Sequence, residues 1–179
     1  MSFSLDVIPA EQEPVSFAAF KKYWLATLAD IPEIALAEDI GLYARRPENE
    51  LKDDDLLDIG ARFSFNHSAN RALTLSLLGL AESYIGDEAK YLDFYAPNDL
   101  EVGEIAILAE KWRQAGYYFK LTSYGHYEKE KALMCVIAIV LAKCTEGRVL
   151  VTAGSVFYRT GIFTPAKFRE NMRFIKNMG

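Results

Sequence analysis

The fold is decided by residues 117–151, which read YYFKLTSYGHYEKEKALMCVIAIVLAKCTEGRVLV. Apolar residues at strand spacing over 117–122 and 148–152 predict two strands, and the apolar stretch around 127–144 predicts a buried helix between them. Two glycines, one shortly before each strand, lie 31 positions apart. This spacing predicts a βαβ crossover, in which the two strands are parallel neighbours and the helix packs against them.

Two more main helices are expected on the N-terminal side of this stretch. Ser16 is the expected N-cap of a helix over roughly 16–29, because a serine hydroxyl accepts a hydrogen bond from the first turn. A second helix is expected over roughly 99–115, where Asn98 and Glu101 resemble a capping box. Further strand candidates are 42–44, 61–65, 72–78, 91–96 and 156–163.

The C-terminal end carries a clear helix start. Thr164 is the expected N-cap, Pro165 takes the first helical position, and Phe163 and Phe168 form a hydrophobic staple. The expected fold class is therefore α+β, with a mixed sheet of five to seven strands, one parallel βαβ pair, three main helices and a C-terminal helix. No Pro-rich or Gly/Ser-rich linker divides the 179 residues, so one domain over 1–179 is expected.

The charge balance argues against a nucleic-acid partner. The formal net charge is −5 with a pI near 5.1, whereas phosphate docking needs a surplus of Lys and Arg. The densest acidic run holds Glu48, Glu50, Asp53, Asp54, Asp55 and Asp58. Two interpretations stay open, a solvated loop and a docking surface for a basic partner. The run lacks the turn glycine and the ligand spacing of a calcium loop.

Cysteines and apolar segments indicate the compartment. Cys135 and Cys144 fall on opposite sides of one predicted helix, so reduced thiols are expected. The longest apolar run, Ala132 to Ala142, has eleven residues, whereas a membrane span needs roughly 20. The first ten residues lack a basic segment followed by an apolar one. We therefore expect a cytoplasmic protein without a membrane span.

No set of residues predicts catalysis, a metal site or a cofactor. His67 and His126 have no Cys or carboxylate at ligand spacing, and Ser155 lies outside any GxSxG motif. One alternative remains, a small enzyme or ligand-binding protein whose pocket lies near Ser123 and His126, at a strand-to-helix turn.

The second half of the chain, from about residue 117 to 170, resembles a known family. It is similar to the C-terminal portion of small α+β immunity proteins of bacterial polymorphic toxin systems. The resemblance is carried by Gly125, Glu130, Ala132, Ile137, Ala138, Leu141, Ala142, Thr145, Gly147, Val149 to Val151, Gly161, Phe163, Thr164, Pro165 and Phe168.

This resemblance implies a cytoplasmic, non-catalytic protein that binds and blocks a cognate secreted toxin. Such toxins are delivered, for example, by contact-dependent or type VI secretion, and they often present cationic surfaces around their active clefts. Families of this kind share no binding motif, so no residue is carried over as functional. The charge pattern instead nominates Glu48, Glu50, Asp53, Asp54 and Asp55 as partner contacts.

Overall fold

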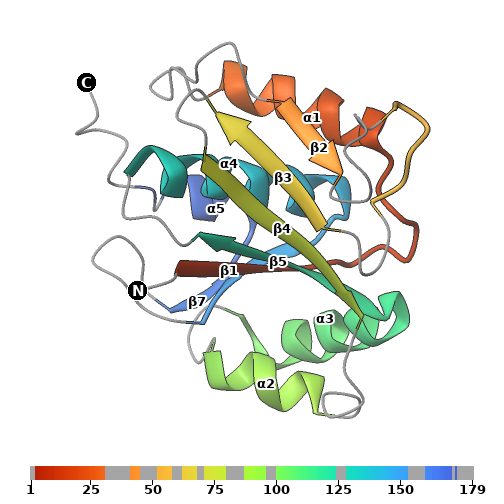
Figure 1. The fold of residues 1–179 in the computed structure, drawn as a ribbon. Helices are drawn as coiled ribbons and strands as arrows, with labels where there is room; N and C mark the ends of the chain where they lie inside the picture. Colours follow the sequence, from red (N-terminus) through yellow and green to blue (C-terminus); the bar gives the residue numbers. More distant parts are fainter. Residues whose placement is uncertain are drawn as a thin grey trace.

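The described part of the chain forms one antiparallel sheet with helices on both faces (Figure 1). The computed structural model describes residues 3–30, 41–44, 52–57, 62–67, 71–79, 87–95, 100–123, 128–152, 160–170 and 172. The described strands are β1 (Phe3–Ile8), β2 (Gly41–Ala44), β3 (Arg62–His67), β4 (Arg71–Gly79), β5 (Tyr117–Ser123), β6 (Arg148–Val151) and β7 (Gly161–Phe163). The described helices are α1 (Phe17–Ala29), α2 (Glu88–Tyr95), α3 (Val102–Ala115), α4 (Glu128–Cys144) and α5 (Pro165–Glu170). The predicted α+β class is confirmed.

Strand β1 occupies an interior position that the sequence analysis gave to no strand. The sheet order is β2-β3-β4-β5-β1-β6-β7, and every neighbouring pair is antiparallel. Strands β5 and β6 run in the same direction and are connected through α4, but β1 is hydrogen-bonded between them. The predicted parallel βαβ pair is therefore wrong. The connection is a split βαβ unit, in which a third strand separates the two strands that the helix joins.

The sequence carries a local signal for this missing strand. Phe3, Leu5 and Val7 alternate with Ser4 and Asp6, which is the period of a strand. In the structure, Leu5 and Val7 lie in the larger core, whose buried residues come mainly from α4 and the sheet. Local periodicity predicts the strand but not its neighbours, because pairing between distant segments depends on the whole sheet.

A second prediction is also wrong, because residues 91–95 of the strand expected over 91–96 lie in helix α2, and residue 96 lies outside the described residues. Leu92 and Phe94 were expected on one side of that strand. In the helix, Leu92 is fully buried while Phe94 is 76% exposed, since two residues are about 200° apart. The rings of Tyr91 and Tyr95 are in contact one turn apart, with centroids separated by 5.0 Å. A short amphipathic helix and a strand are difficult to distinguish over so few residues.

The predicted caps are largely confirmed. Ser16 Oγ accepts a hydrogen bond from Ala19 N at 3.2 Å, and Thr164 Oγ1 accepts one from Lys167 N at 3.2 Å. Helix α3 begins three residues later than expected. Its N-cap is Glu101, whose backbone nitrogen donates to Glu104 Oε2 at 3.0 Å, and Asn98 lies outside the described residues.

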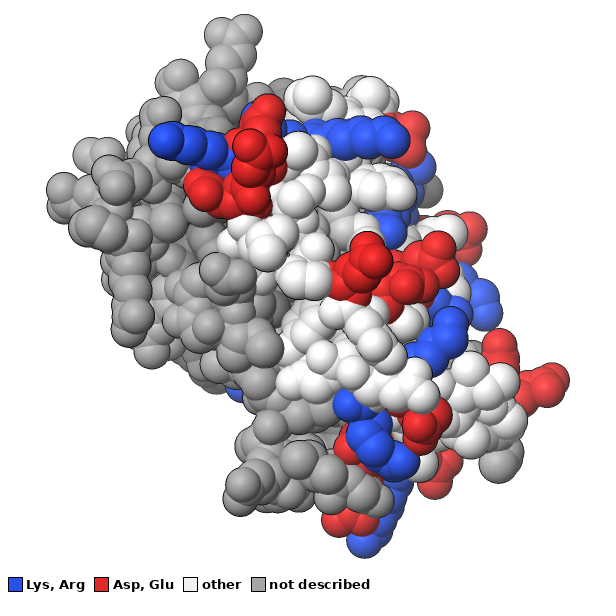
Figure 2. Space-filling view, turned by 90° about the vertical axis from the view of Figure 1, so that its right-hand side faces the viewer, with Lys and Arg blue, Asp and Glu red and all other residues white. Residues whose placement is uncertain are grey.

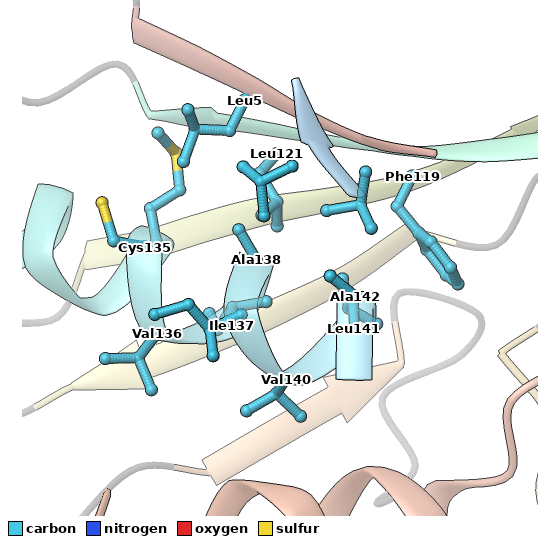
Figure 3. Packing of buried hydrophobic residues seen from close by; sticks show 14 of the residues in the cluster. Leu5, Phe119, Leu121, Cys135, Val136, Ile137, Ala138, Val140, Leu141 and Ala142 are labelled. Carbon is cyan, nitrogen blue, oxygen red and sulfur yellow. The ribbon is translucent and has the colours of Figure 1, made fainter. Parts of the chain in front are cut away.

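The part of α4 whose side chains are described is buried on all sides from Met134 to Ala142, between the sheet and α1. Every residue from Met134 to Ala142 is at most 1% exposed. Figure 3 shows Ala138 beside Leu121 of the sheet, while Val136 and Val140 point away from that strand. On the opposite face, α2 and α3 cover β1, β6 and β7 through a smaller core that contains Ile8, Leu92, Ile105, Leu108, Ala109, Trp112, Leu150 and Ile162 (Figure 1).

The turn between α4 and β6 depends on Gly147. Its backbone nitrogen donates to Ala142 O at 2.8 Å, which closes the end of α4. A Cβ atom at this position would overlap the carbonyl oxygen of Ile8 at the end of β1 and approach Thr145 Oγ1 to 2.8 Å. The close approach of two backbones therefore requires glycine here.

We predict that Gly147→Ala destabilises the protein by roughly 2–3 kcal/mol, because the methyl group must displace the backbone of β1. The matched control is Gly103→Ala on α3, where an added Cβ meets nothing within 4 Å. That substitution should stabilise the protein by about 0.5 kcal/mol through helix propensity. Urea unfolding measures both. Equal stabilities of the Gly147 variant and the wild type would contradict this account of the turn.

Candidate functional site

The described part of the acidic run is a turn that is attached to the start of α1. We call residues 52–57 the acidic turn. The backbone carbonyl of Asp55 accepts from Phe17 N at 2.8 Å, and that of Asp53 accepts from Ala18 N at 3.1 Å. Leu57, 1% exposed, anchors the end of the turn and donates from its backbone nitrogen to Val15 O at 2.8 Å. The turn is thus part of the N-terminal cap of α1.

The three aspartates of the acidic turn differ in what their side chains do. Asp53 forms an ion pair with Lys21, and Asp55 Oδ2 accepts a hydrogen bond from Lys52 N at 2.6 Å. Asp54 is exposed and has no ion pair or hydrogen bond to any described residue. Of the other nominated contacts, Glu48 and Glu50 lie outside the described residues, so the structure assigns them no place.

The surface around the acidic turn is mixed in character. Leu56 is 43% exposed in the turn itself, and Tyr23 and Leu25 are exposed on α1. Figure 2, which views the molecule from the side of this turn, shows carboxylates in several separate groups with basic and uncharged residues between them. Among the described residues of this face, the negative charge is therefore divided into small separate groups.

The alternative pocket near Ser123 and His126 falls mostly outside the described residues. Ser123 ends β5, but its side chain is not described, and His126 lies in the undescribed segment 124–127. Within the described residues, no three His, Cys, Asp or Glu side chains gather where they could hold a metal ion. Cys135 and Cys144 are not joined by a disulfide bond, as predicted. Burial raises the pKa of the Cys144 thiol to about 12, which keeps it protonated and unreactive.

A pocket that the sequence analysis did not anticipate lies on the opposite face of the sheet, beneath α2 and α3. Its volume is about 50 Å³. Its walls come from three strands and two helices, and they are formed by Asp6, Ile8, Tyr91, Trp112, Tyr118, Lys120 and Leu150. Asp6 on β1 and Lys120 on β5 are register partners, so an acidic and a basic residue lie side by side on neighbouring strands.

Asp6 is an unusual residue for the interior of a sheet. It is 9% exposed, and its Oδ1 atom accepts no hydrogen bond from any described residue. Burial raises the pKa of its carboxyl group to about 6, because removal from water disfavours the charged form, while the positive charge of Lys120 acts in the opposite direction. At neutral pH the carboxyl group is therefore mainly ionised in a largely buried place.

Trp112 is a second residue of the pocket wall that has an unsatisfied polar atom. Its indole Nε1–H is buried and finds no hydrogen-bond acceptor among the described residues. Its ring packs between two tyrosine rings of the pocket wall, with centroids 6.0 Å from Tyr91 and 6.2 Å from Tyr118. Asp6 Oδ1 and Trp112 Nε1 are thus two buried polar atoms, on residues of the pocket wall, that lack a partner among the described residues.

Comparison with protein-family models, curated proteins and solved structures gave no match. Among the described helices, none is both long enough and apolar enough to cross a membrane. The acidic turn and the pocket at Asp6 are the two features of the described residues that bear on function.

We predict that Asp6→Asn stabilises the protein near neutral pH. The folded-state pKa lies above the unfolded value of 3.8, so ionisation of Asp6 weakens folding progressively as the pH rises from about 4 to about 6. The variant's stability relative to wild type should therefore increase by about 2–3 kcal/mol between pH 4 and pH 7.5.

Urea unfolding at the two pH values measures this change, and Asp93→Asn, on the exposed side of α2, is the matched control. The control should show no such pH-dependent gain. A constant difference between Asp6→Asn and the wild type at both pH values would show that Asp6 is not desolvated.

Proposed function

We propose that this chain is a non-catalytic immunity protein of the antitoxin type, which binds and neutralises a cognate secreted bacterial toxin through the acidic turn. The observation that carries the proposal is the attachment of this turn to α1. Hydrogen bonds from Phe17 N and Ala18 N hold its backbone, while Asp54 and Leu56 remain exposed. A turn that is already ordered loses little conformational freedom when a partner docks.

Charge and shape give the turn two separate roles in such a complex. The carboxylate of Asp54 attracts a cationic surface during the encounter, because exposed charges act mainly on the association rate. The side chain of Leu56 supplies apolar area that a docked partner removes from water. The resemblance to immunity proteins of polymorphic toxin systems supports a bacterial toxin as this partner and the cytoplasm as the place of the encounter. Inhibition of this kind needs no catalytic residue in the chain.

We predict that Asp54→Lys slows association with the cognate toxin about threefold to tenfold at low salt, and that the difference shrinks at high salt. Asp54 is the suitable position because Asp53 and Asp55 also have structural contacts, which their replacement would remove. Asp93→Lys is the matched control, since it makes the same charge change on exposed α2. Stopped-flow binding at several ionic strengths measures the rates.

Two results would contradict the proposal at different levels. Equal rates for Asp54→Lys and Asp93→Lys would remove the acidic turn as the docking surface but leave the immunity function. Failure of the wild-type chain to co-purify with that toxin, together with failure to protect cells that express it, would refute the immunity function itself.

A further inference from the structure

Helices α2 and α3 are tied directly to each other. Glu88 on α2 is fully buried and forms an ion pair with Arg113 on α3, with 3.1 Å between Oε2 and Nη2. One turn further along α2, the ring of Tyr91 packs against the ring of Trp112, with centroids 6.0 Å apart. The two helices lie side by side over one face of the sheet (Figure 1). We call α2 and α3 together the helix pair.

The helix pair meets the sheet through the smaller core, which combines apolar packing with unsatisfied polar atoms. Ile105 and Leu108 of α3 share this core with Ile8 of β1. Asp6 Oδ1 on β1 and Trp112 Nε1 on α3 are buried there without a partner among the described residues. Closing the helix pair over the sheet therefore removes polar atoms from water without replacing their hydrogen bonds, which costs free energy.

Strand β1 is the fixed side of this contact. Asp6 has a register partner on both neighbouring strands, Lys120 on β5 and Leu150 on β6, and the other face of β1 lies in the larger core. Helix α3, in contrast, is joined to β5 through the single residue Gly116, whose φ of 74° is a conformation that glycine adopts without strain. Water can therefore reach Asp6 by movement of the helix pair more easily than by movement of β1.

We propose that the helix pair opens from the sheet as one unit, and that the charge on Asp6 sets how often it opens. In the open form, water hydrates both Asp6 and Trp112 Nε1. Opening also exposes the apolar residues of the smaller core, so the open form is a minor population. An ionised carboxylate costs more to bury than a protonated one, so ionisation of Asp6 makes opening more frequent.

Asp6 is the group at this contact that changes charge near pH 6. Burial raises its pKa from 3.8 to about 6, while the positive charge of Lys120 acts in the opposite direction. The other titratable residues of the pocket wall are Tyr91 on α2 and Tyr118 on β5, and its residues on α3 and β6 do not titrate. Lysine and tyrosine side chains ordinarily titrate near pH 10. The ratio of open to closed molecules should therefore rise about tenfold from pH 5 to pH 7.5, because Asp6 has its ordinary pKa when the helix pair is open.

Native-state hydrogen exchange of the full chain, followed by NMR at pH 5 and pH 7.5, tests the proposal. Each measured rate is divided into the intrinsic rate of the same group at that pH, which gives a protection factor. Central backbone amides of α2 and α3 and the indole Nε1–H of Trp112 report on the helix pair. Amides of residues 134–142 in α4 report on the larger core. The chain has two tryptophans, and Trp112→Phe assigns their indole signals.

The expected result is one shared protection factor for α2, α3 and the Trp112 indole, at least about tenfold below that of α4. This factor should fall about tenfold from pH 5 to pH 7.5. Equal protection of the helix pair and α4 would overturn the proposal, because only unfolding of the whole chain would then release the helices. Different factors for α2 and α3 would show that they do not move as one unit. A factor that is the same at both pH values would overturn the role of Asp6.

The variant Asp6→Asn separates the charge from the packing, because asparagine has nearly the shape of the protonated acid. It should remove the pH dependence and raise the protection factor of the helix pair at pH 7.5 at least about tenfold. The matched control Asp93→Asn, on the exposed side of α2, should keep the wild-type pH dependence. A tenfold fall that persists in Asp6→Asn would show that another group controls the opening, which would overturn the proposal.

Discussion

The pairing of β1 with both β5 and β6 is the constraint on which the rest of the structure depends. The two faces of this strand build different parts of the molecule. Leu5 and Val7 enter the larger core beneath α4, while Asp6 and Ile8 face the layer of α2 and α3. The carbonyl of Ile8 also sets the space available to the turn at Gly147. Displacement of β1 would therefore disturb both cores, the start of β6 and the pocket together.

The sequence predicts local structure here better than it predicts pairing. Helices α1, α4 and α5 follow from an N-cap serine, a long apolar run and a Thr-Pro start, which are signals within a few residues. The split βαβ unit could not be derived in this way. Two strands joined by a helix have the same local pattern whether they are neighbours or are separated by a third strand. The position of β1 depends on contacts with segments more than a hundred residues away.

Because the sequence reveals local patterns better than long-range contacts, it predicts one of the two candidate sites and misses the other. The acidic turn is visible in the sequence because its charges are consecutive, yet the sequence does not reveal that Asp53 and Asp55 are used inside the molecule. The pocket has no local signature, because its walls come from five elements spread between residues 6 and 150. The sole sequence signal is Asp6, an acidic residue in an apolar strand, and it becomes informative only once both of its faces are known to be covered.

Packing alone does not explain why Asp6 stands at this position. If the site served packing alone, an apolar residue or an asparagine of similar size would fill it without desolvating a charge. Lys120 does not remove this difficulty, because the pKa of Asp6 is raised despite the nearby positive charge. Asp6 Oδ1 and Trp112 Nε1 are both buried without a partner among the described residues, so this layer carries a cost in unmade hydrogen bonds. The layer beneath α2 and α3 is therefore less well satisfied in hydrogen bonding than the apolar core around α4, and Asp6 is the residue that makes it so.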